Sequence, residues 1–178
     1  MRFQELPQSA HPDYELRLIR EADLETLFSY LSAPAVIETM GEGPTSVADL
    51  AWCAREGSTG SESTPLRLAI SRRESGELVG TVGLHSASSR HRSVEIACDL
   101  SPSLWGKGVA AYMTGLTVDW AHRDLRYARV QATALPENQR SLALLERCGF
   151  QREGLLRSYR FIGGRHRDFL VYSHFDLR

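Results

Sequence analysis

Between Leu66 and Leu100 the sequence alternates apolar and polar side chains in three successive segments, the period expected of strands packed on a core. The three segments are 66–72, 78–84 and 94–100. The first two are separated only by a turn around Glu74–Gly76, and so short a connection joins antiparallel neighbours. Pro102 ends the third segment, and helical spacing follows over 108–124. A meander that leads directly into a long helix predicts a mixed α/β fold.

The rest of the chain supplies further elements on both sides of this meander. We expect strands at 15–20, 129–135, 150–159 and 165–176, and helices at 22–32, 47–56 and 138–148. Pro34 is expected to close the first helix, residues 57–65 to form a loop, and residues 1–13 to form a loose lead-in. The prediction is one α/β domain over 1–178, with a mixed, mostly antiparallel sheet of about seven strands flanked by about four helices.

Composition excludes several classes of protein. No apolar run approaches the ~18 residues that span a membrane, and the N-terminus has no apolar core of a signal peptide. Three distant cysteines favour reduced thiols in a cytoplasm over a disulfide framework, and no Cys or His pair has zinc-site spacing. Residues 1–89 carry 13 acidic and 7 basic residues, whereas residues 90–178 carry 9 and 14. The basic second half suits a polyanionic ligand, although solvated surface charge explains it equally well.

The segment between the third strand and the long helix carries Gly106, Lys107 and Gly108. Two glycines let the backbone approach a ligand closely, and the following helix start offers free N–H groups to an anion. A Walker loop is excluded because Ser101 and Gly108 stand where that pattern needs a Gly and a Ser or Thr. A dinucleotide fingerprint matches only as a bare pattern, since that motif normally opens a βαβ series. A purely structural turn is the remaining alternative.

Trp105-Gly-Lys-Gly-Val-Ala110 resembles the pyrophosphate-binding motif Q/R-x-x-G-x-G/A of the GNAT acetyltransferase superfamily, with Trp105 in place of the initial Gln or Arg. The resemblance is strongest to the RimJ/RimL branch, the ribosomal-protein N-terminal acetyltransferases and their relatives. Glu95–Pro102 resembles the family's fourth strand, and Asn138-Gln-Arg-Ser141 with Cys148-Gly-Phe150 resembles its N-x-x-S helix ending in G-F. The order of elements agrees from residue 14 to 178. The implied activity is transfer of an acetyl group from acetyl-CoA to a primary amine, without a metal.

The resemblance also implies which residues bind acetyl-CoA. Pantetheine is expected to lie like an extra strand along backbone near Cys98–Leu100, with the pyrophosphate on the amides of residues 105–110. Asn138 is expected to bind pantetheine or, alternatively, to cap its helix. Arg140 and Arg147 are candidates for the phosphates, Arg147 being equally a solvated helix residue. The implied cofactor-binding residues are Cys98, Asp99, Leu100, Trp105, Gly106, Lys107, Gly108, Val109, Ala110, Asn138, Ser141 and Arg147.

The same resemblance points to Glu95 and Ser141 as catalytic residues. Glu95 matches the family's glutamate and is the expected base, with Asp99 as runner-up. Both carboxylates are equally consistent with salt bridges or action through water. Many relatives protonate the thiolate with a tyrosine four residues before the G-F glycine, but that position is Leu145 here. Ser141 matches the serine of the RimJ/RimL pattern and is the expected donor to the thiolate.

No motif identifies the amine acceptor. A protein N-terminus and a small amine are both open, and a non-catalytic acyl-CoA sensor is the alternative function. Aromatic and apolar residues that are candidate walls of the acceptor pocket are Tyr30, Met40, Trp52, Tyr159 and Phe161. Glu38 and Glu42 are candidates to attract an amine. We expect no nucleic-acid or membrane partner, and leave a homodimer open.

Overall fold

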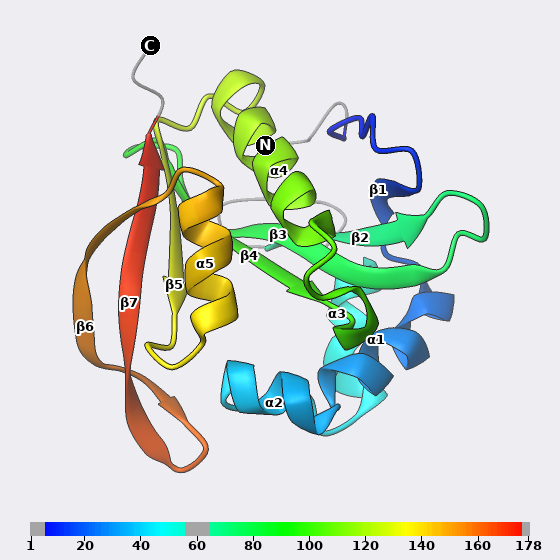
Figure 1. Ribbon diagram of the computed structural model, residues 1–178, viewed down its shortest axis with the longest axis horizontal. Helices are drawn as coiled ribbons and strands as arrows, with labels where there is room; N and C mark the ends of the chain where they lie inside the picture. The colour runs from blue at the N-terminus through cyan, green and yellow to red at the C-terminus, as the bar shows by residue number, and fades with distance from the viewer. Residues whose placement is uncertain (1–5, 56–64, 176–178) are drawn as a thin grey trace.

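A seven-stranded sheet organises residues 6–55 and 65–175, the parts of the chain that the computed structural model describes (Figure 1). The strands are β1 (Tyr14–Leu18), β2 (Leu66–Arg72), β3 (Leu78–Ser88), β4 (Ser93–Leu100), β5 (Arg129–Ala134), β6 (Gln151–Ile162) and β7 (Arg165–Phe175). Their order in the sheet is β1-β2-β3-β4-β5-β7-β6. All neighbouring pairs are antiparallel except β4 and β5, which run parallel. The predicted mixed, mostly antiparallel α/β fold is confirmed.

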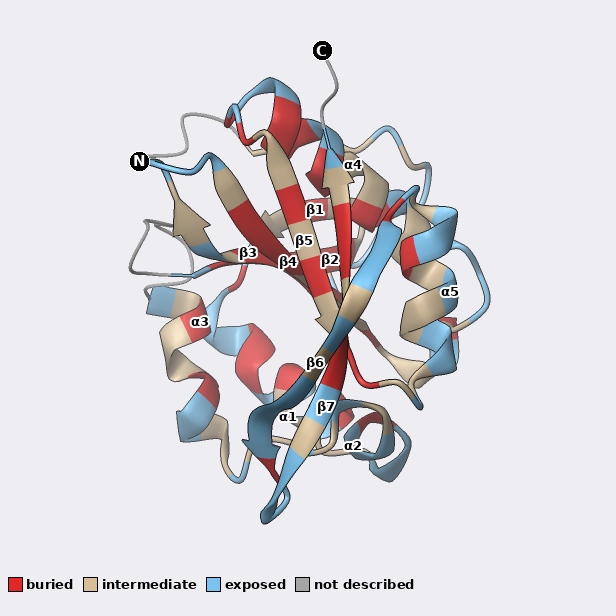
Figure 2. Ribbon diagram, turned by 90° about the vertical axis from the view of Figure 1, so that its left-hand side faces the viewer, coloured by how far each residue is buried: buried red, intermediate tan, exposed pale blue. Residues whose placement is uncertain are grey.

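Helices cover both faces of this sheet. They are α1 (Leu24–Leu31), α2 (Pro34–Met40), α3 (Ala51–Arg55), α4 (Val109–Arg123) and α5 (Gln139–Arg147), with short 3-10 turns at Glu21–Asp23, Val47–Leu50 and Pro102–Leu104. α4 buries Val109, Met113 and Val118 in a core cluster with inward residues of β2–β5, and α1 and α3 form a second cluster against Ala69 and Leu78. The central strands are accordingly buried, whereas the edge strand β6 is largely exposed (Figure 2).

The helix α2 was missed in the sequence, where Pro34 was expected only to end the preceding helix. Pro34 is instead the first residue of α2, a position that needs no N–H and suits the fixed φ of proline. The described helices therefore include five α-helices where about four were expected. The predicted capping box between Ser46 and Asp49 is present, and Gly149 has the expected positive φ of 82°.

The segment before β1 is tethered, in contrast to the loose lead-in that was expected. Residues 6–13 form no helix or strand, but the Ala10 amide donates to the Tyr112 hydroxyl of α4 at 3.0 Å. Nε of Arg73 donates to the His11 carbonyl at 2.9 Å. Residues 1–5, most of the expected loop 57–65, and residues 56 and 176 of predicted elements lie outside the described residues. Within the described residues, no helix is long and apolar enough to cross a membrane.

Gly83 of β3 lies directly against the backbone of β2. A Cβ atom added there would lie 2.2 Å from the Leu66 carbonyl oxygen, whereas one at Gly154 would meet no atom within 4 Å. We expect Gly83→Ala to lower the free energy of unfolding by about 1–3 kcal/mol, because backbone must move to admit the methyl group. Gly154→Ala is the matched control and should change it by less than about 0.5 kcal/mol. Urea denaturation of both variants measures the difference, and equal effects would contradict it.

Candidate active site

The pairing of β4 with β5 ends in the middle of β4. The register runs Ser93 with Arg129, Val94 with Val130 and Glu95 with Gln131, and no later pair follows. β4 nevertheless continues to Leu100, held on its other side by β3, while β5 continues to Ala134 beside β7. The two parallel strands therefore part beyond Glu95. Backbone groups of β4 that face the gap have no strand partner among the described residues, which makes this edge able to pair with an extended ligand.

The glycine loop lies at the carboxyl end of the same strand. Gly106 and Gly108 have φ values of 77° and 81°, in the region that side chains disfavour, and Gly108 is the N-cap of α4. A Cβ on either glycine would meet nothing within 4 Å, so their backbone faces open space. Among described residues, the amides of Gly106, Gly108 and residues 109–111 find no acceptor. These free N–H groups at the start of a 15-residue helix suit a pyrophosphate.

Trp105 and Lys107 differ from the other loop residues, because their amides are engaged inside the turn. The Trp105 N–H donates to Pro102 at 3.2 Å and the Lys107 N–H to Leu104 at 3.3 Å. The Trp105 indole also donates to the Leu100 carbonyl at 2.8 Å. The amides of these two residues already have acceptors, so the prediction that residues 105–110 hold the pyrophosphate rests mainly on the other amides of the loop.

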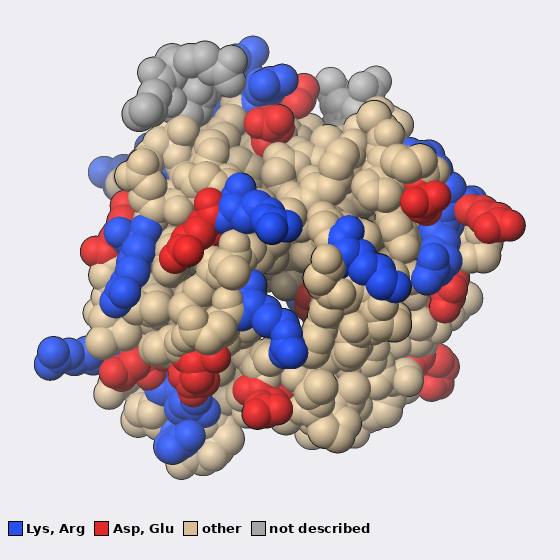
Figure 3. All heavy atoms as spheres, viewed as in Figure 1, with Lys and Arg blue, Asp and Glu red and all other residues tan. Residues whose placement is uncertain are grey.

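The guanidinium of Arg140 lies over the Trp105 ring, 4.4 Å from its centroid. This contact brings a positive charge from α5 to the glycine loop. In the family pattern, Trp105 itself stands at the position of the Gln or Arg, three residues before Gly108. Arg140 therefore adds a guanidinium beside the residue that replaces the Gln or Arg, in addition to the Lys107 charge within the loop. Figure 3 shows that the surface here is hollowed, between α4, α5 and α2 as seen in Figure 1, and bordered by Lys and Arg side chains.

Glu95 is buried at the point where the strands part. Its relative exposure is 3%, and its carboxylate accepts hydrogen bonds from Thr133 at 2.7 Å and Gln131 at 3.2 Å, both on β5. Nη2 of Arg160, on β6, donates to the same carboxylate at 3.1 Å. Burial lowers the pKa of His85, whose Nε2 lies 3.9 Å from Oε1 of Glu95, despite the carboxylate nearby. His85 is then neutral at pH 7, and Arg160 is the cation that compensates Glu95.

Asp99 lies on the same face of β4 and is held by a separate polar cluster. Arg67 of β2 and the Tyr30 hydroxyl of α1 both donate to its carboxylate, and Thr81 of β3 donates at 2.7 Å. Burial, together with the Asp99 charge, raises the pKa of Tyr30 well above its ordinary value, so its phenol stays protonated. Asp99 raises the pKa of Arg67 despite the opposing effect of burial. The salt bridge that was left open for Asp99 is thus present.

Cys98 points to the opposite face of β4, toward the cluster beneath α4. Burial raises the pKa of its thiol to about 12, with a further contribution from the Asp99 charge. The Cys98 side chain is therefore a protonated core group at neutral pH. The predicted contact of Cys98 with the cofactor concerns its backbone and not its thiol.

The helix α5 presents the remaining predicted residues. Asn138 caps it: its Oδ1 accepts from the Ser141 amide at 3.1 Å, and its Nδ2 donates to the Thr39 carbonyl at the end of α2 at 3.0 Å. The Ser141 hydroxyl is half-buried and has no hydrogen-bond partner among the described residues. Leu145 is buried in the core at 6% exposure. Arg147 is exposed at the far end of the helix, about 10 Å along its axis from Arg140.

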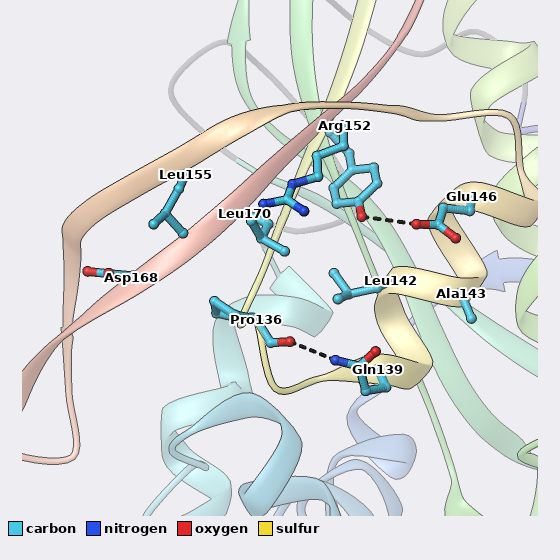
Figure 4. A pocket seen from close by; sticks show the side chains of 10 residues that line it. Pro136, Gln139, Leu142, Ala143, Glu146, Arg152, Leu155, Asp168 and Leu170 are labelled. Carbon is cyan, nitrogen blue, oxygen red and sulfur yellow. Dashed lines mark hydrogen bonds between the residues drawn. The ribbon is translucent and has the colours of Figure 1, made fainter.

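A separate cavity of about 590 Å³ lies on the outer side of α5, facing the β6–β7 hairpin (Figure 4). Tyr172 donates to Glu146 across it at 3.2 Å, and Gln139 donates to the Pro136 carbonyl at its edge. Its walls combine apolar side chains, among them Leu142 and Leu155, with charged groups of both signs. Neither Glu95 nor the glycine loop lines it, so we place the candidate active site at the strand gap.

Sequence reasoning missed Arg67, Thr81, His85 and Arg160 as members of the site. Thr81 is the cross-strand partner of Asp99, and His85 that of Glu95, so the register between β3 and β4 brings them together. The meander predicts this register only after the position of the turn between β3 and β4 is known. Arg160 is separated from Glu95 by 65 residues, and no local pattern connects the two.

Comparisons with known proteins agree with this geometry. Residues 14–151 match a protein family described as "Acetyltransferase (GNAT) domain". The chain is 32% identical over 160 residues to the N-acetyltransferase YoaA of Bacillus subtilis, covering 89% of this chain and 90% of that protein. It is 32% identical over 94 residues to the [ribosomal protein uS5]-alanine N-acetyltransferase of Escherichia coli, covering 51% and 48%. The fold matches a Vibrio cholerae spermidine N-acetyltransferase, solved with CoA and spermine, at a TM-score of 0.78, 23% identity and coverage of 93% and 96%.

The position of Arg140 generates a prediction about cofactor affinity. We expect Arg140→Ala to raise the Kd for CoA about tenfold, as for the loss of one charge-assisted hydrogen bond to phosphate. Arg147→Ala is the matched control on the same helix and should change the Kd less than about threefold, because its charge is exposed and distant. Isothermal titration calorimetry measures both values. A larger loss from Arg147→Ala would reverse the assignment.

Proposed function

The chain belongs to the GNAT acetyltransferase family, whose members use acetyl-CoA, and we propose that it acetylates a primary amine by direct attack in a ternary complex. The acceptor is proposed to be a peptide N-terminus or a small amine. Relatives named for an alanine of ribosomal protein uS5 and for spermidine support both types. The parting of β4 from β5 beside the loop of Gly106 and Gly108 is the observation that carries the proposal.

The cofactor's parts fit the described groups in order along β4. The free amides at the start of α4 would hold the pyrophosphate, and the unpaired edge of residues 96–100 would pair with pantetheine. The Leu100 carbonyl already accepts from the Trp105 indole, so pantetheine would rely mainly on the residues before it. This order brings the thioester toward Glu95, where the gap begins.

Acetyl transfer forms one new C–N bond and requires three proton transfers. The acceptor ammonium first loses a proton, because only the free amine attacks the thioester carbonyl. The C–N bond forms and the C–S bond then breaks, with an unpaired N–H near the strand gap stabilising the oxyanion between these steps. The nitrogen loses its second proton as the amide forms, and the departing thiolate gains one. The products are an acetylated amine and CoA.

We assign the base role to Glu95 rather than Asp99. Each carboxylate accepts hydrogen bonds from three side chains, so the choice rests on position: Glu95 lies at the last registered pair, where the gap begins, and Asp99 lies four residues farther along β4. We assign proton donation to the thiolate to Ser141, whose hydroxyl is uncommitted among the described residues. Asn138 is committed to capping α5 and to α2, so its proposed contact with pantetheine uses the remaining capacity of its amide.

Acetyl-CoA should raise the melting temperature, because a ligand that binds only the folded state stabilises that state by mass action. At a hundredfold excess over Kd the gain is about 2.7 kcal/mol. A thermal-shift titration measures the effect, with NAD as the control that should leave the melting temperature unchanged. An equal response to NAD would support a dinucleotide site instead.

Substitution of the proposed proton-transfer residues should lower turnover without weakening cofactor binding. Glu95→Gln and Ser141→Ala should each reduce kcat by about 10²-fold or more, with the Kd for CoA within a few-fold of wild type. Thiol release with a saturating acceptor measures kcat, and calorimetry measures the Kd. A near-normal rate in Glu95→Gln would move the base role to Asp99 or water, and full activity in Ser141→Ala would leave the thiolate to be protonated by solvent.

A further inference from the structure

The two carboxylates that β4 presents beside the gap carry little uncompensated negative charge. Glu95 and Asp99 point to the same side of β4, opposite α4, as alternate residues of one strand must. Each is compensated by an arginine: Asp99 by Arg67 and Glu95 by Arg160. A polyamine that entered here would find both carboxylates already paired, so these groups offer it little attraction.

Arg160 is the more exposed of these two cations. Its side chain is 42% exposed, against 22% for Arg67. It extends from β6, the outer strand of the hairpin that crosses the sheet in Figure 2, to β4 and β5. Its Nη2 contacts Glu95 at 3.1 Å and Thr133 at 3.0 Å, the latter through the threonine hydroxyl.

Two aromatic rings hold the same guanidinium. Its central carbon lies 5.2 Å from the ring centroid of Tyr159 and 5.0 Å from that of Phe169. The group is therefore fixed in orientation before any ligand arrives. Only Nη2 of Arg160 donates to described residues, which leaves the N–H groups of Nε and Nη1 without a protein acceptor there. A fixed, half-exposed guanidinium with free donors is a ready partner for a carboxylate.

We propose that Arg160 binds a carboxylate of the acceptor, so that the substrate is an amine that carries a carboxylate close to the reacting nitrogen. The inference rests on the proposed acetyltransferase function and deepens it. The carboxylate of the acceptor binds Arg160, and its amine then lies close to the thioester beside Glu95. The same Arg160 guanidinium donates a hydrogen bond to Glu95. Two sources share this chemistry: a free amino acid, and a peptide N-terminus followed by an acidic residue.

Matched pairs of acceptors test the proposal on the intact protein. Thiol release is measured with free amino acids against their carboxamides, and with peptides that begin Ala-Asp against peptides that begin Ala-Asn. Spermidine forms a third arm. We expect one of the two acidic sources to exceed its neutral twin by about tenfold in kcat/KM, and to exceed spermidine. The arm that shows this preference identifies the source.

Variants then tie the preference to Arg160. Arg160→Gln should bring the acidic and neutral twins within about twofold of each other, whatever its effect on overall rate, and Arg160→Lys should keep part of the preference. Arg157→Gln removes an exposed arginine of the same strand and should leave the ratio as in wild type. The ratio separates recognition from any loss that follows from leaving Glu95 unpaired.

Four results would overturn the inference. Neutral twins as good as the acids in wild type, or spermidine as the best acceptor, would leave Arg160 only as the counter-charge of Glu95. A preference that survives Arg160→Gln would place carboxylate recognition on another residue. Acetyl-CoA binding without thiol release from any amine would instead overturn the proposed function, and this inference with it.

Discussion

The parting of β4 and β5 beyond Glu95 is the constraint on which the site depends. A parallel pair that stops after three registered pairs leaves backbone donors and acceptors unmatched inside the molecule, a costly arrangement unless something else satisfies them. The buried carboxylate of Glu95 lies where the gap begins. It accepts hydrogen bonds from Gln131 and from Thr133, which is two residues farther along β5. Glu95 thereby links β4 to β5 at their last registered pair, and this link fixes the position at which the gap begins.

Trp105 connects the end of β4 to the glycine loop. Its indole donates to the last carbonyl of β4, and its ring packs against both core clusters, so the loop is anchored to the sheet on either face. Gly106 and Gly108 can then adopt positive φ and leave their amides open, since the stability of the turn comes from its neighbours. Arg140 stacks on the same ring and links α5 to the loop. One large side chain thus orients the strand end, the anion site and a cation together.

The sequence predicts most of the fold because its elements carry clear periods. The alternation in 66–72 and 94–100 and the capping box at Ser46 gave elements within a residue or two of those observed. It failed at Pro34, where proline is compatible with both the end of one helix and the start of another. The partners of Glu95 and Asp99 were also beyond reach, since each depends on strand register or on a contact between distant segments.

The two halves of the site differ in how far apart their residues lie in the sequence. The proposed cofactor site consists of backbone amides and two glycines within a few consecutive residues, and a contiguous pattern of this kind is visible in one sequence. The proposed acceptor side consists of side chains from β2, β3, β4, β5, β6 and α1, brought together only by the fold. In the sequence, none of these side chains stands in a local pattern that marks it as part of a site. Because the acceptor face is assembled from single positions on separate strands, substitutions at those positions can change the acceptor without disturbing the loop that binds the acetyl donor, and a family that keeps one donor can in this way accept many amines.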